Sequence, residues 1–90
     1  MIFEWDPAKN QSNQKKHGID FDSARPLWDD PDRIEITAPY PVEDRHIMIG
    51  EIESHLWTAI YTLRKGVVRI ISVRRSRKKE GQLYEKEKLG

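Results

Sequence analysis

The run from Val67 to Arg75 constrains the fold of this chain more than any other stretch. It reads Val-Val-Arg-Ile-Ile-Ser-Val-Arg-Arg, and so many β-branched residues together are typical of a strand that is buried on at least one face. Because side chains alternate along a strand, a regular strand would place Arg69 and Arg75 on one face and Ser72 and Arg74 on the other. Each face would then be apolar along most of its length and cationic at one end. We therefore expect a core strand that presents paired guanidinium groups at a sheet edge, where they can hold an anion.

The charge of the chain is unevenly distributed, although its formal net charge is only +1. Residues 1–63 hold 6 Lys and Arg against 12 Asp and Glu, a balance of −6, whereas residues 64–90 hold 10 against 3, a balance of +7. This asymmetry predicts a basic surface for a polyanion, with RNA phosphate as the preferred candidate, and an acidic surface that suits a basic protein partner. A well-solvated C-terminal helix would give the same charge pattern without any partner.

The size of the chain predicts a single domain, 1–90, with one hydrophobic core. There is no cysteine, so neither a disulfide nor a thiolate metal site can stabilise the fold. No apolar run approaches the roughly 20 residues that a membrane-spanning helix needs, and the first residues lack the features of a signal peptide. We therefore expect a cytoplasmic protein that does not contact a membrane.

The N-terminal third predicts one short strand and two helices. A weakly alternating strand is expected at residues 2–5. A polar helix then begins at an Asp-Pro pair and runs to about His17, and Gly18 follows it as the left-handed residue after the C-terminus. A second helix begins near Asp20 and must be short, because Pro26 would interrupt its hydrogen bonding.

The rest of the chain predicts an antiparallel sheet followed by a helix. The expected strands lie at residues 33–37, 45–52, 55–61 and 67–75, and the expected helix lies at 77–89. The links between these strands are short, which favours an antiparallel meander. The predicted fold class is α+β, with a small antiparallel sheet, two N-terminal helices and a C-terminal helix.

Metal-independent cleavage of RNA is the chemistry that the polar residues fit best. Such cleavage needs a base that removes the ribose 2′-OH proton, an acid that protonates the leaving 5′-oxygen, and cations that stabilise the charge on the phosphate oxygens. Arginine suits the last role because its planar fork holds two oxygens at once, and histidine suits the first two because it titrates near neutrality. The sequence has no paired histidines and no glycine-rich phosphate loop, so we expect neither a metal nor another cofactor.

The candidate residues fall into two groups. The catalytic candidates are His17, Arg45, Arg64, Arg74, Glu80 and Tyr84. The candidates for RNA binding are Arg69, Ser72, Arg75, Arg77 and Lys78. In the first group His17 and Tyr84 are the acid–base candidates, and Glu80 would orient one of them. The sequence leaves open which residue takes which role.

Several of these residues also have an ordinary structural interpretation. The alternatives are a helix C-terminal position for His17, an ion pair with Glu43 or Asp44 for Arg45, a cross-strand pair for Arg69, a helix salt bridge for Glu80, and packing of a helix onto the sheet for Tyr84. Two further functions stay open beside the enzyme. The chain would then be a non-catalytic nucleic-acid-binding module, or a protein whose cationic end serves only to dock a partner.

With these residues in view, the chain resembles the BrnT family of bacterial toxins over nearly its whole length. The resemblance rests on Phe3-Glu4-Trp5-Asp6-Pro7-Ala8-Lys9, on Asn13 with Lys16-His17-Gly18-Ile19, on Phe21 and Ala24, on Arg-x-Ile-x-Ile-Gly at 45–50, on Thr62 with Arg64, on Arg69-Ile70-Ile71-Ser72-x-Arg74, and on Glu80 with Tyr84-Glu85. The chain departs from the usual pattern at Pro26, in the second helix, and at Val73, next to Arg74.

The resemblance implies a RelE-like fold, which agrees with the order of elements expected above. It implies a metal-independent endoribonuclease toxin that cleaves RNA and so inhibits translation. It also implies a cognate antitoxin of the ribbon-helix-helix type, similar to BrnA, which neutralises the toxin and carries the contacts of the complex to operator DNA. In this interpretation Arg45, Arg64 and Arg74 converge at one rim of the sheet, close enough to hold one phosphodiester.

Overall fold

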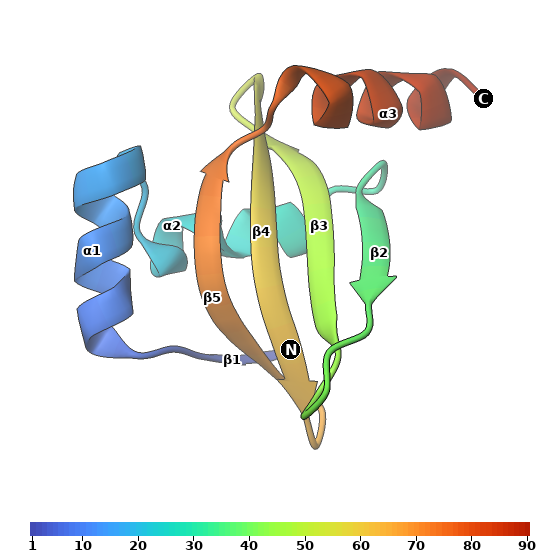
Figure 1. Ribbon diagram of the computed structural model, residues 1–90. Helices are drawn as coiled ribbons and strands as arrows, with labels where there is room; N and C mark the ends of the chain where they lie inside the picture. Colours follow the sequence, from blue (N-terminus) through green and yellow to red (C-terminus); the bar gives the residue numbers. More distant parts are fainter.

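The computed structural model describes all 90 residues, and its elements follow the expected order (Figure 1). They are β1 (Ile2–Glu4), α1 (Pro7–His17), α2 (Phe21–Ala24), the 3-10 helix η1 (Arg25–Asp29), β2 (Ile34–Ala38), β3 (Arg45–Ile52), β4 (His55–Arg64), β5 (Val67–Arg75) and α3 (Lys78–Leu89). The α+β fold class is confirmed. None of the helices has the length and apolar character that crossing a membrane requires.

The sheet has five strands in the order β1-β5-β4-β3-β2. Strands β2 to β5 form the expected antiparallel meander, and β1 lies parallel to the first part of β5. Two-residue turns join β3 to β4 at Glu53 and Ser54, and β4 to β5 at Lys65 and Gly66. All four turn residues have positive φ, as hairpins whose twist matches that of the strands require. These turns fix the register that decides where the arginines lie.

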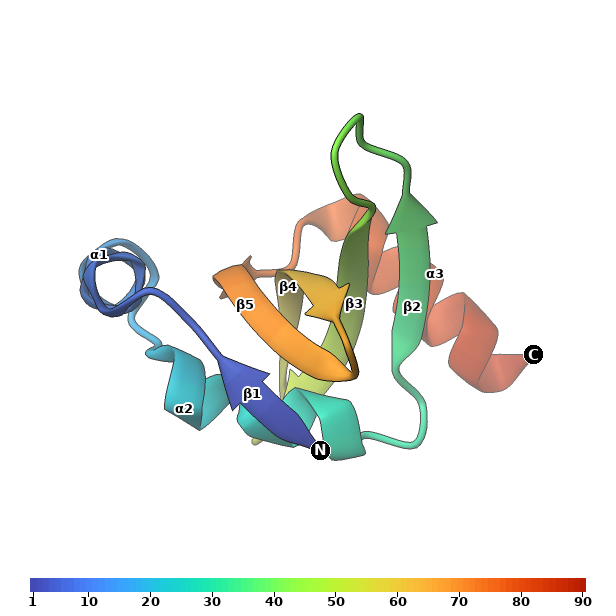
Figure 2. The ribbon, with the colours of Figure 1, turned by 90° about the horizontal axis from the view of Figure 1, so that it is seen from below.

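The hydrophobic core lies between the sheet and the two helical segments α2 and η1, on what we call the inner face (Figure 2). Phe21, Leu27 and Val73 are among the fully buried core residues. Helix α2 has only four residues, so the prediction that it is short is confirmed. The chain continues as η1, where Pro26 stands in the first turn and its missing N–H is no loss.

The polar helix α1 is held on the sheet by a single buried amide. Asn13 donates hydrogen bonds from Nδ2 to the carbonyl oxygens of Ile19 (2.9 Å) and Val73 (2.8 Å), and its Oδ1 accepts from the Val73 N–H (3.0 Å). The neighbouring strand β1 pairs only with residues 67–69 of β5, so the amide satisfies backbone groups beyond the end of β1. Helix α1 therefore needs no apolar stripe to stand beside β5 (Figure 1).

Strand β5 contains a bulge, which overturns the expected alternation. Ile70 pairs with Tyr61 and Ser72 with Ile60, so Ile71 is an extra residue without a partner. Val68, Ile70 and Val73 are consequently all buried on the inner face. The prediction that Arg69 shares a face with Arg75, and not with Arg74, is wrong, because the bulge resets the alternation after Ile70.

Candidate functional site

Four arginines project from the sheet face opposite α2 and η1, which we call the outer face. They come from three strands: Arg45 from β3, Arg64 from β4, and Arg69 and Arg74 from β5. Their nearest inner-face neighbours along each strand, such as Val73 and Val68, are buried in the core, so alternation directs the arginines outward. The basic surface predicted from the sequence thus lies on one side of the sheet.

The arginines do not converge at one rim, so that prediction is wrong. In the register of the sheet Arg74 lies opposite Thr58, and Arg69 lies opposite Thr62. Four residues of β4 correspond to about 13 Å along the strand. Arg45 and Arg64 lie at the Thr62 end, because the β3–β4 pairing places His46 opposite Tyr61. The antiparallel register therefore divides the basic residues into two clusters at opposite ends of the outer face.

The first cluster, the Arg74 cluster, consists of Thr58, Arg74, Ser76 and Glu80. Arg74 donates two hydrogen bonds to the carboxylate of Glu80, from Nη1 to Oε1 and from Nη2 to Oε2, both 2.8 Å long. Thr58 Oγ1 donates to Glu80 Oε1 (3.0 Å) and shares a hydrogen bond of 2.8 Å with Ser76 Oγ. The backbone N–H of Arg77 also donates to Glu80 Oε1 (2.7 Å). Glu80 thus connects the end of β5 to the first turn of α3.

The electrostatics of this cluster fix both charges. The hydrogen bonds from Arg74 lower the pKa of Glu80 to about 2, aided by the Arg77 N–H and the Thr58 hydroxyl. The same interaction raises the pKa of Arg74. Only about 22 % of the Arg74 side chain and 23 % of the Glu80 side chain remain exposed. Glu80 is consequently a weak base that positions Arg74, rather than a group that takes up a proton near neutral pH.

The second cluster, the Arg64 cluster, consists of Arg45, Arg64 and Arg69 with the carboxylates of Glu4 and Glu43. Arg64 donates from Nε and Nη2 to the two carboxylate oxygens of Glu43, at 3.1 and 3.0 Å. Arg69 donates from Nη1 to Glu4 Oε2 at 2.7 Å, which is the cross-strand pair given above as the alternative to RNA binding. Hydrogen bonding from Arg64 lowers the pKa of Glu43, and the charges of Arg45 and Arg69 lower it further. Arg64 therefore holds this loop carboxylate directly, and the charges of Arg45 and Arg69 act on it from farther away.

Arg45 takes a different position from the one expected of a surface ion pair. Its guanidinium carbon lies 5.0 Å from the centre of the Tyr40 ring, a cation–π contact. It forms no salt bridge with Glu43 or Asp44. Arg45 is therefore the arginine of this cluster that has no carboxylate partner.

The last residue of α1, His17, lies at a small cavity beside the bulge in β5. The cavity holds about 170 Å³ and is lined by Lys9, Ser12, Asn13, Lys16, His17, Ile71 and Ser72. The structure thus places two of the candidate residues, His17 and Ser72, at the same cavity. Ile71 and Ser72 stand between Arg69 and Arg74 along the chain, so the histidine flanks the strip of outer face that separates the two clusters.

A family model for the "ribonuclease toxin, BrnT, of type II toxin-antitoxin system" matches residues 5–80. The chain belongs to the BrnT family. No curated protein matches the sequence. Membership of the family implies RNA cleavage and a cognate antitoxin as partner. The matched segment includes His17, the whole Arg74 cluster and all of the Arg64 cluster except Glu4.

The last catalytic candidate of this BrnT-family chain is Tyr84, which lies apart from His17. Its side chain is 1 % exposed, and its hydroxyl donates to Asp30 Oδ2 at 2.7 Å. Burial and the bond to Asp30 raise the pKa of Tyr84 far above its usual range. Asp30 Oδ2 also accepts from the Glu51 N–H (2.9 Å), so the pair ties α3 to the end of the sheet (Figure 1). Contact between Tyr84 and an RNA would require α3 to move.

Three candidates for RNA binding lie beyond the Arg74 cluster. Arg75 stacks over Trp57 with 5.4 Å between its guanidinium carbon and the ring centre. Arg77 and Lys78 are exposed at the start of α3. Arg77 and Lys78 extend the cationic surface past the end of β5, whereas Arg75 lies on the inner face, because it pairs with Trp57 in the sheet.

Sequence reasoning missed two basic residues at the His17 cavity, Lys9 and Lys16. Lys9 and Lys16 are seven residues apart, so they lie on the same side of α1, near His17. This helical spacing is the sequence pattern from which both residues could have been predicted at the site.

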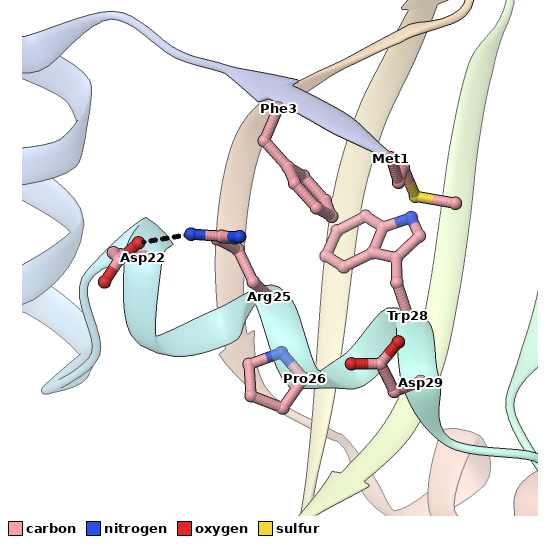
Figure 3. A pocket seen from close by; sticks show the side chains of 7 residues that line it. All are labelled: Met1, Phe3, Asp22, Arg25, Pro26, Trp28 and Asp29. Carbon is pink, nitrogen blue, oxygen red and sulfur yellow. Dashed lines mark hydrogen bonds and ion pairs between the residues drawn. The ribbon is translucent and has the colours of Figure 1, made fainter.

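A different cavity of about 410 Å³ lies between β1 and η1, where Arg25 pairs with Asp22 and packs over Phe3 (Figure 3). Because Phe3 belongs to the inner face, this cavity is separated from both arginine clusters by the sheet.

Proposed function

We propose that this protein is a metal-independent endoribonuclease toxin that cleaves RNA in the cytoplasm and thereby inhibits translation. A ribbon-helix-helix antitoxin similar to BrnA binds and neutralises it, and only the antitoxin of that complex contacts operator DNA. The observation that carries the proposal is the placement of His17 beside Ser72, between two arginine clusters on one face of the sheet. The family match supports the RNA substrate.

The proposed reaction uses the ribose next to the scissile phosphate. His17 removes the proton of the 2′-OH, and the 2′-oxygen attacks phosphorus as the bond to the 5′-oxygen breaks. The products are a 2′,3′-cyclic phosphate and a 5′-hydroxyl end, and Lys16 supplies the proton that the leaving oxygen takes up. Arg74 stabilises the charge that develops on the phosphate oxygens, and Glu80 is the positioning residue that holds its guanidinium group.

Purified protein and growing bacteria together test this proposal. Wild type should cleave RNA in excess EDTA and should arrest growth when expressed without antitoxin. Arg74→Ala should lose about a hundredfold or more of the cleavage rate, and Arg74→Lys, which keeps the charge but not the bidentate contact, should lose nearly as much. Lys79→Ala, which removes an exposed charge from α3 outside the cluster, is the matched control.

Equal growth arrest by wild type and Arg74→Ala would overturn the assignment of Arg74.

A second candidate function is a non-catalytic RNA-binding or docking module. The observation in its favour is that Arg64, Arg69 and Arg74 each have a carboxylate partner within the protein. Binding of RNA without any product in EDTA would favour that function over the nuclease.

A further inference from the structure

We propose that the Arg64 cluster is a second phosphate site, separate from Arg74, and that the carboxylate of Glu43 occupies it until an RNA phosphate displaces it. This inference rests on the proposed action on RNA and extends it to the number of phosphates that the protein holds. The second site would make Glu43 a competitor of the substrate.

The cluster has the donor arrangement of an anion site. Arg45, Arg64 and Arg69 come from three adjacent strands, and Arg69 lies directly opposite Thr62. Arg64 follows Thr62 by two residues and therefore points to the same face. On the other side of β4, Arg45 directly precedes His46 in β3. Because His46 pairs with Tyr61, Arg45 lies beside Thr62 as well. Three arginines thus flank one position of β4 in the register of the sheet.

The hydroxyl at that position lacks a partner. Thr62 is 1 % exposed, and its Oγ1 is buried without any hydrogen bond. Buried polar groups are nearly always hydrogen-bonded in folded proteins. A buried hydroxyl without a partner, at the position that the three arginines flank in the sheet, is a further hydrogen-bond donor for an oxyanion.

Glu43 makes with Arg64 the contacts that a phosphate would make. Its two oxygens accept from Nε and Nη2 of Arg64, the fork-to-fork geometry that Arg also uses for phosphate. Glu43 lies in the loop between β2 and β3, which projects from the outer face (Figure 2). The Arg64 side chain remains 57 % exposed and that of Glu43 33 %, so an incoming anion can reach the pair. A carboxylate carried on a loop can leave without disturbing the sheet.

The charge balance and the spacing favour a separate phosphate. Three arginines face the two carboxylates of Glu4 and Glu43, so the cluster keeps an excess positive charge that rises when Glu43 leaves. The row of Arg74 lies about 13 Å along the sheet from the row of Thr62. Arg74 is held by Glu80, whereas Arg64 is held by Glu43, so the two clusters hold different phosphates of the same strand in this proposal.

The test uses a ribonucleotide hexamer with 2′-O-methyl groups, which cannot be cleaved through the 2′-oxygen, and measures its binding by fluorescence anisotropy in EDTA. Glu43→Gln should bind about three- to fivefold tighter, the range that one exposed ion pair permits. Arg64→Gln should bind at least about fivefold more weakly and should reduce the salt dependence by about one phosphate contact. Thr62→Val, which removes only the hydroxyl, should also weaken binding.

Two control variants match these changes in charge. Glu53→Gln removes an exposed carboxylate at the opposite turn, and Lys65→Gln removes an exposed cation next to Arg64. Each should change the affinity by less than twofold, and thermal melting should show all variants folded. In the double variant Glu43→Gln with Arg64→Gln, the gain from Glu43→Gln should disappear.

The outcomes separate this inference from the nuclease proposal. Binding that changes as expected, with no cleavage of natural RNA, supports the second phosphate site and ends the nuclease. Cleavage by wild type with Glu43→Gln identical to Glu53→Gln in affinity ends the second site and leaves the nuclease. Absence of hexamer binding by wild type and Glu43→Gln alike also overturns the second site.

Discussion

Arg69 and Arg74 project from the same face of β5, although a spacing of five residues would place them on opposite faces of a regular strand. The extra residue Ile71 causes this, because Ile70 pairs with Tyr61 and Ser72 with Ile60. The bulge keeps Val68, Ile70 and Val73 on the inner face and brings Arg69 and Arg74 together on the outer face. Both arginine clusters can therefore contact one RNA strand.

Stability at low pH should depend on the ion pair between Arg74 and Glu80. The pKa of Glu80 is lowered from 4.5 to about 2 in the folded protein, so its ionised form stabilises the fold. That contribution is fully present above pH 4.5, and it is lost as the pH falls toward 2. A shift of this size corresponds to roughly 3 kcal/mol at most. Urea unfolding of Glu80→Gln at pH 7 should show a loss of this order.

The same comparison at pH 2.5 should show a much smaller difference between Glu80→Gln and wild type. Glu85→Gln removes an exposed carboxylate from the same helix and serves as the control, with a change below about 0.5 kcal/mol. A Glu80→Gln difference that stays constant from pH 7 to pH 2.5 would contradict the electrostatic explanation.

Removal of the buried amide of Asn13 should loosen α1. Asn13→Ala leaves the N–H and carbonyl of Val73 and the carbonyl of Ile19 without their partners. Unsatisfied buried groups cost about 1–3 kcal/mol each, so we expect a loss of about 3 kcal/mol in urea unfolding. Gln11→Ala, an exposed position on the same helix, should change stability little. Hydrogen exchange that leaves the α1 amides as protected as in wild type would argue against this anchor.

Much of the fold could be predicted because local signals decide it. The left-handed Gly18, with φ of 74°, ends α1 where expected, and the side chain of Asp20 caps α2. The bulge was missed because strict alternation was assumed along the whole strand. One extra residue at Ile71 directs Val68, Ile70 and Val73 to the inner face and Arg69 and Arg74 to the outer face.

The site was less predictable because its contacts join residues distant in the sequence. The ion pair between Arg64 and Glu43 joins a strand to the loop between β2 and β3. The hydrogen bond from Tyr84 to Asp30 joins residues 54 positions apart in the sequence. Charge pattern shows that such residues are available but not which partner each one takes. The predicted convergence of Arg45, Arg64 and Arg74 is wrong because it depends on the register of the hairpins. In that register Arg64 at the end of β4 and Arg74 at the end of β5 lie at opposite ends of the sheet.

Tyr84→Phe should separate an acid–base role from an anchoring role. The variant loses the hydrogen bond to Asp30 (2.7 Å) and should lose about 1–2 kcal/mol of stability. Because the hydroxyl is buried and its pKa is raised, cleavage of RNA at 25 °C should fall by less than tenfold. Loss of a general acid or base costs about 10²–10⁴ in rate. A loss in that range, with the variant folded, would restore Tyr84 as a catalytic residue.

His17→Gln should abolish most cleavage while leaving RNA binding intact. The variant removes the acid–base group at the cavity that reaches Ser72, and the expected loss of rate is about 10²–10³. Binding of the 2′-O-methyl hexamer should stay within twofold, because the arginine clusters are unchanged. His55→Gln alters an exposed histidine at the start of β4 and should cleave as wild type does. Equal rates for His17→Gln and His55→Gln would move the acid–base chemistry away from α1, whereas a parallel fall in binding and cleavage would make His17 a binding residue.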